Sequence, residues 1–528
     1  MSELPEGWIH TLLSDVAHWG SGGTPSRNNP AYYGGRIPWI KTGELGQGVI
    51  TDTEEKITEL GLQNSSAKLF PKGSVAVAMY GATIGKTAIL GIEAATNQAC
   101  AVGIPIEGVI TTEYLLHYLA SQKDAFVEAG KGGAQPNISQ SVIKNWAIPL
   151  APLNEQKRIA DKLDRLLARV DACRERCDRI PLILNRFRQS VLTAAISGEL
   201  TENWRESNPD LVDASDDATV LRKAHEDAGG HKRGNAADPT DEVHDLEISM
   251  FPEGWQLMEL RDLVRPDKPI TYGILKPGPE LEDGIPYIRV ADFPKNKLNL
   301  TTIRKTSPAI DTEFARSRLS AGDILLSIRG TVGRLVVIPP ELSGANITQD
   351  SARLSIQDSV ERDYVLWFLR SEFAQTRMKQ AEKGVAVRGI NIGDVRALQV
   401  PLPSKSEQQE IIRRITALFT YADRLETRYQ TAHAQVDRLT PALLDKAFRG
   451  ELVPQDPNDE PATVLLEQIR SELATAKTNK SERGKRVTVK STSPLAQVIM
   501  LTRKDVRLAD EILTELLAED ASEENTQR

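Results

Sequence analysis

The chain has few of the residues that mark a secreted, membrane-bound or metal-binding protein. Its 528 residues include only 3 cysteines and 7 histidines. Three cysteines cannot form a disulfide framework, which fits a reducing cytoplasm. The sequence has no run of eighteen apolar residues and no basic-then-apolar leader, so we expect neither a membrane span nor a secretory signal. A cytoplasmic protein is the expectation.

Catalytic signatures are missing too. The scattered histidines form no His-Glu-x-x-His or Ser-His-Asp arrangement, and no paired carboxylates, motor motif or nuclease motif stand out. Cys173 and Cys177 lie four residues apart with no histidine in the same predicted helix, so we interpret them as packing residues rather than metal ligands. The sequence therefore predicts a non-catalytic protein without a metal or cofactor of its own.

Two partial motifs leave alternatives open. Residues 29–32 (NPAY) resemble the Asn-Pro-Pro-aromatic motif of adenine-N6 methyltransferases, in which the aromatic ring stacks on a flipped base. No glycine-rich nucleotide-binding turn precedes them, so a Gly/Pro-rich loop is favoured and a methyltransferase stays the alternative. Residues 81–87 (GATIGKT) place three residues between the glycines where a phosphate-binding loop needs four, which favours a tight turn.

The net charge of −8 is concentrated in one segment. Residues 201–250 hold 13 acidic and 5 basic side chains, whereas residues 1–150 hold 13 and 10, and residues 251–402 hold 19 and 21. Overall acidity therefore does not exclude a DNA-facing surface made of local patches. The acidity does argue against tight DNA binding by these modules in the absence of partners.

What the chain does contain is a long internal repeat. Residues 5–8 (PEGW) return at 252–255, residues 37–41 (IPWIK) return at 285–289 as IPYIR, and residues 197–200 (SGEL) return at 449–452 as RGEL. The offset rises only from 247 to 252. A repeat of about 200 residues is a duplicated domain rather than a solenoid unit. Two similar modules on one chain can read two separate half-targets.

Each copy begins with an α+β module and ends in a long helix. Strand-like runs at 74–79 and 323–328 lead into glycine turns, and helical stretches follow at 112–121 and 362–371. The expected divisions are two modules, two long helices, an acidic linker with a short helix, and a tail with short helices. In chain order they are 1–150 (module), 151–200 (helix), 201–250 (linker), 251–403 (module), 404–453 (helix) and 454–528 (tail).

The helical parts carry apolar residues at alternating steps of four and three, the heptad pattern of a coiled-coil seam. Pro181 and Pro441 are expected to kink or interrupt the helices. Because neither seam can stay exposed, we expect the two helices to pack on each other. An antiparallel arrangement would place the modules at opposite ends. The predicted seam includes Ile159, Leu163, Leu166, Val170, Ile180, Leu184, Ile411, Ile415, Leu418, Leu425, Val436 and Leu439.

The repeat extends beyond the helices. A short fragment, residues 218–221 (ATVL), recurs at 462–465 after the second helix. A terminal helix is predicted over 506–516 from one apolar face.

Several motifs together resemble the specificity (S) subunit of type I restriction-modification systems. They are residues 22–26 (GGTPS), 34–39 (GGRIPW), 135–139 (QPNIS), 149–156 (PLAPLNEQ) and 443–454 (LLDKAFRGELVP), and the likeness spans roughly residues 5 to 470. It implies two target-recognition domains separated by a long antiparallel two-helix coiled coil. Each domain would read one half of a split double-stranded DNA sequence, and the coil would set the spacer.

The resemblance also implies partners. Two methyltransferase subunits would dock on the helices, and motor-nuclease subunits would join them for cleavage. S-adenosylmethionine, ATP and Mg²⁺ would then belong to those partners. A coiled-coil scaffold that organises partners without reading DNA is the remaining alternative.

Candidate DNA contacts are the polar, cationic and aromatic side chains of the glycine-rich loops, since such groups bind phosphates and base edges. They are Ser26, Arg27, Lys41, Lys86, Gln135 and Asn137 in the first module, and Tyr272, Arg289, Arg329, Arg334, Arg388 and Asn391 in the second.

Overall fold

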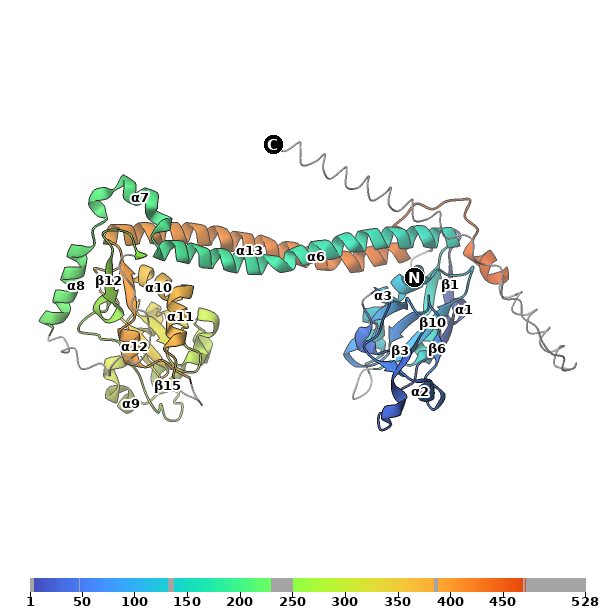
Figure 1. The fold of residues 1–528 in the computed structure, drawn as a ribbon, viewed down its shortest axis with the longest axis horizontal. Helices are drawn as coiled ribbons and strands as arrows, with labels where there is room; N and C mark the ends of the chain where they lie inside the picture. The colour runs from blue at the N-terminus through green and yellow to red at the C-terminus, as the bar shows by residue number, and fades with distance from the viewer. Residues whose placement is uncertain are drawn as a thin grey trace, which may run out of the picture. The chain divides into compact units, whose positions relative to one another are not determined.

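The computed structural model of the chain describes residues 4–46, 48–131, 137–228, 250–383, 388–468 and 471. Contacts divide the chain into two compact units, one of residues 1–158 with 453–528 and one of residues 159–452 (Figure 1). The helix predicted over 506–516 lies outside the described residues.

The first unit is an α+β module built on two larger sheets. One sheet has the strand order β2-β10-β7-β8-β4 and the other β5-β3-β9-β6. Its strands are short and rich in small apolar residues, and all four residues of β7 are buried. The strands are β1 Ile9–Leu12, β2 Ala17–Ser21, β3 Tyr33–Ile40, β4 Gly48–Ile50, β5 Lys56–Ile57, β6 Leu69–Phe70, β7 Val75–Ala78, β8 Thr87–Leu90, β9 Ala94–Thr96, β10 Cys100–Pro105 and β11 Ala147–Leu150. The helices are α1 Leu13–Val16, α2 Glu59–Gln63, α3 Thr112–Ser121, α4 Lys123–Ala129 and α5 Gln140–Lys144.

The second unit holds the matching module, with sheets ordered β13-β19-β16-β17 and β15-β14-β18. Its strands are β12 Gln256–Glu259, β13 Thr271–Tyr272, β14 Ile285–Ile288, β15 Arg304–Thr306, β16 Ile324–Ser327, β17 Leu335–Val337, β18 Asn346–Ile347, β19 Ser351–Leu354 and β20 Gln399–Leu402. Its shorter helices are α7 Glu202–Ser207, α8 Ser215–Asp227, α9 Pro308–Glu313, α10 Arg362–Arg370, α11 Glu372–Gln380 and α12 Ile392–Arg396. The prediction of two α+β modules is confirmed.

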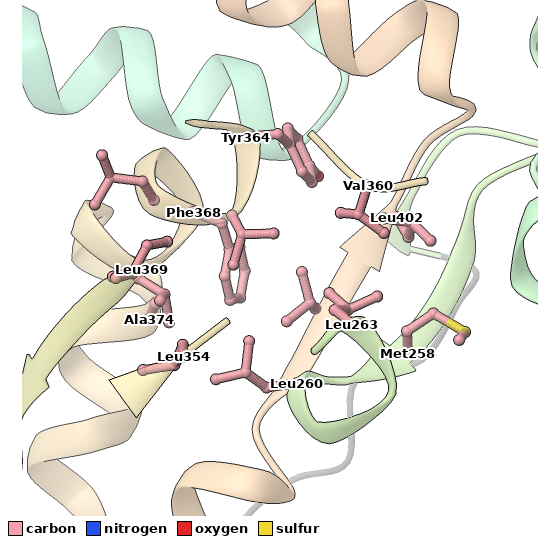
Figure 2. Close-up of a cluster of buried hydrophobic side chains, with 14 of the residues drawn as sticks. Met258, Leu260, Leu263, Leu354, Val360, Tyr364, Phe368, Leu369, Ala374 and Leu402 are labelled. Atoms are coloured by element: carbon pink, nitrogen blue, oxygen red, sulfur yellow. The ribbon is translucent and has the colours of Figure 1, made fainter. Parts of the chain in front are cut away.

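The core of the second module is formed where α10 meets the strands. Tyr364 and Phe368 of α10 point into a cluster with Leu263 and with Leu402 of β20 (Figure 2). Tyr364 is 1% exposed, and its hydroxyl donates to the carbonyl of Pro401 at 2.5 Å. Each such large side chain contributes roughly 1.5–3 kcal/mol through burial.

Each module is closed by its own first and last strands. β1 pairs with β11, with Ile9 opposite Leu150, and β12 pairs with β20, with Gln256 opposite Leu402. The last strand of each pair leads directly into a long helix, α6 (Leu153–Ile196) or α13 (Lys405–Phe448). The base of each module is therefore continuous with a helix of 44 residues, about 66 Å long.

Within the second unit, residues 159–196 of α6 pack antiparallel on α13, the teal and orange helices of Figure 1. Arg174 contacts Asp437 at 3.2 Å, whereas Arg188, further along α6, contacts Asp423 at 2.7 Å. The partner number falls as the α6 number rises, which is the signature of an antiparallel pair. The predicted two-helix coiled coil is confirmed.

The predicted seam residues are buried to different degrees. Ile159, Leu163, Val170, Leu184, Ile411 and Ile415 are buried; Leu166, Ile180, Leu418, Leu425 and Val436 are half-buried; and Leu439 is 45% exposed. Ile159, Leu163, Ile411 and Ile415, toward the ends of the helix pair, are fully buried, and Ile411 and Ile415 belong to the core cluster of the second module. Cys173, interpreted as a packing residue, is exposed.

The prolines do not interrupt the helices. α6 runs through Pro181 and α13 through Pro441. Each proline removes one backbone N–H donor, but packing along the rest of a 44-residue helix outweighs the loss of a single hydrogen bond. The predicted interruption is therefore wrong.

The repeated short fragments pack crosswise between the copies. Ala214, at the start of α8, donates its backbone N–H to the carbonyl of Gly254 at 2.9 Å, so the segment after the first helix fastens to the second module. Ala462 donates to the carbonyl of Gly7 at 2.9 Å, so the segment after the second helix fastens to the first module. Each module is thus completed by residues that follow the other copy's helix.

Candidate DNA-recognition surface

A buried polar cluster fixes each module on its helix and explains two of the repeated motifs. Trp8 Nε1 donates to Glu155 Oε2 at 3.0 Å, and Trp255 Nε1 donates to Glu407 Oε2 at 2.9 Å. The next residue, Gln156 or Gln408, caps nearby backbone groups from a buried position, at 2.8–3.0 Å. The Pro-Glu-Gly-Trp and Glu-Gln motifs therefore attach the base of each module to its helix. The glycine-rich loops are left as the candidate recognition residues.

Two equivalent turns follow β3 and β14. Lys41 and Arg289 precede the short 3₁₀ turns Thr42–Glu44 and Val290–Asp292. Both cations are held by carboxylates of their own module. Lys41 Nζ lies 3.0 Å from Glu54, and Arg289 forms bonds of 3.0 and 2.6 Å to the fully buried Asp292.

The carboxylates stabilise the charged form of these cations. Glu54 and then Glu55 raise the pKa of Lys41, and Asp292 raises the pKa of Arg289. Because Lys41 and Arg289 already have internal partners, any DNA contact by them must compete with those ion pairs.

Arg27 is also engaged within its module. Its guanidinium lies 4.4 Å from the ring centroid of Tyr33 and 5.1 Å from that of Trp39, and it donates to Glu55 at 2.7 Å. Its side chain is still 54% exposed, so one face remains open to solvent. Ser26, beside it, is exposed.

The glycine turns after β7 and β16 meet a second loop in each module. Tyr80 bridges to Asn137, Arg329 bridges to Gly389, and Gly330 donates its N–H to the carbonyl of Arg388 at 3.1 Å. Gly330 has φ +73°, which favours glycine. In each module the two loops therefore form one surface, which carries Lys86 and Asn137 in the first module and Arg329, Arg334 and Arg388 in the second.

The remaining candidates differ in their exposure and role. Tyr272 is 37% exposed, and the guanidinium of Arg316 lies 5.9 Å from its ring centroid. Asn391 caps α12, because its Oδ1 accepts from the N–H of Asp394 at 2.9 Å. Gln135 lies outside the described residues. Asn29, from the methyltransferase-like motif, caps a 3₁₀ turn through the N–H of Ala31 at 3.1 Å.

Sequence reasoning missed Asp350, because it sought cations. Asp350 lines a cavity of about 360 Å³ together with Arg329 and Arg334. The repeat gave no signal for it, because the equivalent residue of the first module is Ala99, whose carbonyl accepts from the N–H of Met79 as that of Asp350 accepts from Ile328.

Neither a metal centre nor a membrane span emerges from the part of the chain that the structure describes. No group of three or more His, Cys, Asp or Glu side chains in it could hold a metal ion. No helix among the same residues has both the length and the apolar character needed to cross a bilayer.

The chain is similar to known specificity subunits over most of its length. The family model described as the type I restriction modification DNA specificity domain matches residues 5–180 and 252–432. The EcoBI specificity subunit of Escherichia coli is 36% identical over 358 residues, covering 66% of this chain and 69% of that protein. The EcoKI specificity subunit of Escherichia coli strain K12 is 29% identical over 514 residues, covering 92% and 99%.

A solved structure shares the fold. The crystal structure of the HsdS subunit from Thermoanaerobacter tengcongensis has a TM-score of 0.52 at 21% identity, covering 85% of this chain and 98% of that chain. Two family matches placed on the two repeated modules, with relatives aligned across both, lead to one assignment. The chain belongs to the type I restriction-modification specificity subunits and is the DNA specificity subunit of such a system.

Proposed function

We propose that residues 1–150 and 251–403 each read one half of a bipartite double-stranded DNA target, with the helix pair setting the spacer between the halves. One observation carries the proposal: the two modules share a scaffold but present different side chains on the loop surface. Tyr80, Lys86 and Ala99 in the first module correspond to Arg329, Arg334 and Asp350 in the second. Different side chains on equivalent loops favour two different half-sites.

The chain is the non-catalytic component of its system, so the chemistry belongs to partners. We propose that two methyltransferase subunits dock on the helices, that motor-nuclease subunits join for cleavage, and that S-adenosylmethionine, ATP and Mg²⁺ bind to those subunits. The complex would work in the cytoplasm. The nearly neutral modules support this, because partners would have to supply much of the phosphate contact.

A module exchange tests the proposal. Residues 1–150 are replaced by the corresponding module of a relative with a different target, and the variant is produced with its methyltransferase partner. Sequencing of methylated adenines in the host should show one half-site changed, with the other half and the spacer retained. A change in both halves, or in neither, would contradict the two-reader model. The reciprocal exchange of residues 251–403 is the matched control.

A further inference from the structure

The cavity beside the second module's glycine turn contains charged side chains of both signs. It measures about 360 Å³ and lies between residues 290–291, residues 329–334 and Asp350. Arg329 is exposed at its edge, while Arg334 and Asp350 are half-buried.

The backbone holds these side chains together. The N–H groups of Ile328 and Arg329 both donate to the carbonyl of Asp350, at 2.8 and 3.3 Å. Arg334 is fastened to the wall, because its N–H donates to Ser327 Oγ at 2.8 Å and its guanidinium reaches the carbonyl of Val290 at 3.3 Å. Arg329 and Asp350 therefore start from neighbouring, fixed positions on one surface.

The charged groups of Arg329 and Asp350 are nevertheless unpaired among the described residues. Among the described residues, neither the Arg329 guanidinium nor the Asp350 carboxylate has a hydrogen bond or ion pair. Elsewhere in this module neighbouring opposite charges do pair, as Arg289 does with Asp292 and Arg318 with Asp311. The Arg329 guanidinium can donate to acceptors of a ligand, and the Asp350 carboxylate beside it can accept from a donor of the same ligand. Together they suit a ligand edge that carries acceptors next to a donor.

We propose that Arg329 and Asp350 read one G·C base pair from the major groove. The two parallel N–H groups of Arg329 match O6 and N7 of guanine, and the Asp350 carboxylate accepts from the N4 amino group of the paired cytosine. An A·T pair fits less well, because neither of its bases presents two adjacent acceptors to the guanidinium fork. The inference rests on the proposed function and names one base pair of the second half-site.

The first module has different chemistry at the same two positions. Tyr80 takes the place of Arg329 and makes the equivalent bridge to the second loop. Ala99 takes the place of Asp350, since its carbonyl accepts from the N–H of Met79 as the carbonyl of Asp350 accepts from the N–H of Ile328. An alanine side chain offers no acceptor to the amino group of cytosine. The first module therefore supplies natural replacement residues that the shared scaffold already accommodates.

The test uses the full chain in complex with its methyltransferase partner. In Arg329→Tyr and in Asp350→Ala, sequencing of methylated adenines should show that one G·C position of the second half-site is relaxed, with its preference reduced about tenfold or more. The first half-site should be unchanged. Arg265→Ala is the control, since Arg265 is an exposed arginine of the same module that pairs with Asp267.

A modified base locates the contact. Purified wild-type complex should bind about tenfold more weakly when 7-deazaguanine, which lacks the N7 acceptor, replaces guanine at that position. Inosine, which keeps O6 and N7, should leave binding unchanged. Arg329→Tyr should no longer distinguish guanine from 7-deazaguanine.

The outcomes separate the inference from the proposed function. If wild-type methylation is sequence-selective but both variants keep the same target, the G·C assignment is overturned and the function stands. A uniform loss across all sequences, including the first half-site, would assign Arg329 to a phosphate or to assembly and overturn the inference as well. If the wild-type complex shows no sequence preference, the proposed function itself fails.

Discussion

At the scale of single residues, the cations predicted to face DNA fall into two groups. Arg289 is tied to Asp292, a partner three residues along that was visible in the sequence. Lys41 is tied to Glu54 and Glu55 across a loop, which no local spacing indicates. Arg329 is exposed, and no carboxylate among the described residues forms an ion pair with it. Residue type and loop position therefore predicted which loops form the candidate DNA-recognition surface. They could not predict which of its charged side chains lack a partner within the module.

Two equivalent glutamates make a residue-scale prediction. Glu407 Oε1 accepts from Arg205 at 2.6 Å and from Thr201 at 2.7 Å, whereas Glu155 Oε1 accepts no hydrogen bond from the described residues. Glu407→Gln should therefore lower the free energy of unfolding by about 1.5–3 kcal/mol, because it breaks a buried charged contact. Glu155→Gln should leave stability unchanged or raise it. Thermal unfolding of the full-length variants measures both.

The pH dependence gives an independent check on Glu155. Burial raises the pKa of its carboxyl, more than Trp8 and Arg158 lower it. The folded state therefore binds this proton more tightly than the unfolded state, and stability falls as pH rises from the ordinary carboxyl pKa through the raised one. The gain from Glu155→Gln should be larger at pH 7.5 than at pH 4.5. An equal effect at both values would mean that Glu155 does not carry a buried charge.

At the scale of elements, the heptad spacing predicted both long helices and their pairing. It could not predict which seam positions are buried, because periodicity places a residue on a face without saying what covers it. Leu184 and Leu439 both lie on the predicted seam, yet Leu184 is 6% exposed and Leu439 is 45% exposed. Local helix propensity also could not predict that α6 continues through Pro181, since this depends on the packing of the whole helix.

This difference makes an element-scale prediction. Leu184→Ala should cost about 2–5 kcal/mol, as removal of a buried leucine does. Leu439→Ala should stay within about 0.5 kcal/mol, as expected at a surface position. Chemical denaturation of the two variants side by side measures the contrast. Equal losses would show that the helices pair along the predicted seam throughout, against the arrangement in the structure.

At the scale of the whole molecule, the repeat predicted two modules and two helices but not the crosswise exchange of their short fragments. Residues 214–221 complete the module that follows them, whereas residues 462–465 complete a module that begins more than 450 residues earlier in the chain. A contact at that separation leaves no local pattern. Its consequence is that both modules have the same construction, although one begins the chain and the other lies within it.

The charge of the whole molecule leads to the last prediction. Because the first module has three more acidic than basic residues and the second only two more basic than acidic, few phosphates can be neutralised by this chain. The chain alone should therefore bind its target weakly, with a shallow slope of log K against log salt. Adding the methyltransferase partner should steepen the slope by about 0.9 for each phosphate contact that it contributes.

Fluorescence anisotropy on a target duplex, titrated in buffers of increasing salt, measures this slope, and a duplex with both half-sites scrambled is the control. Scrambling should weaken binding by the complex while leaving its slope nearly unchanged, since phosphates position the protein and base edges specify the sequence. A steep slope for the chain alone would place the phosphate contacts on its own loops. This subunit would then supply both the base contacts and most of the phosphate contacts. The nearly neutral charge of the modules indicates instead that partners supply the phosphate contacts.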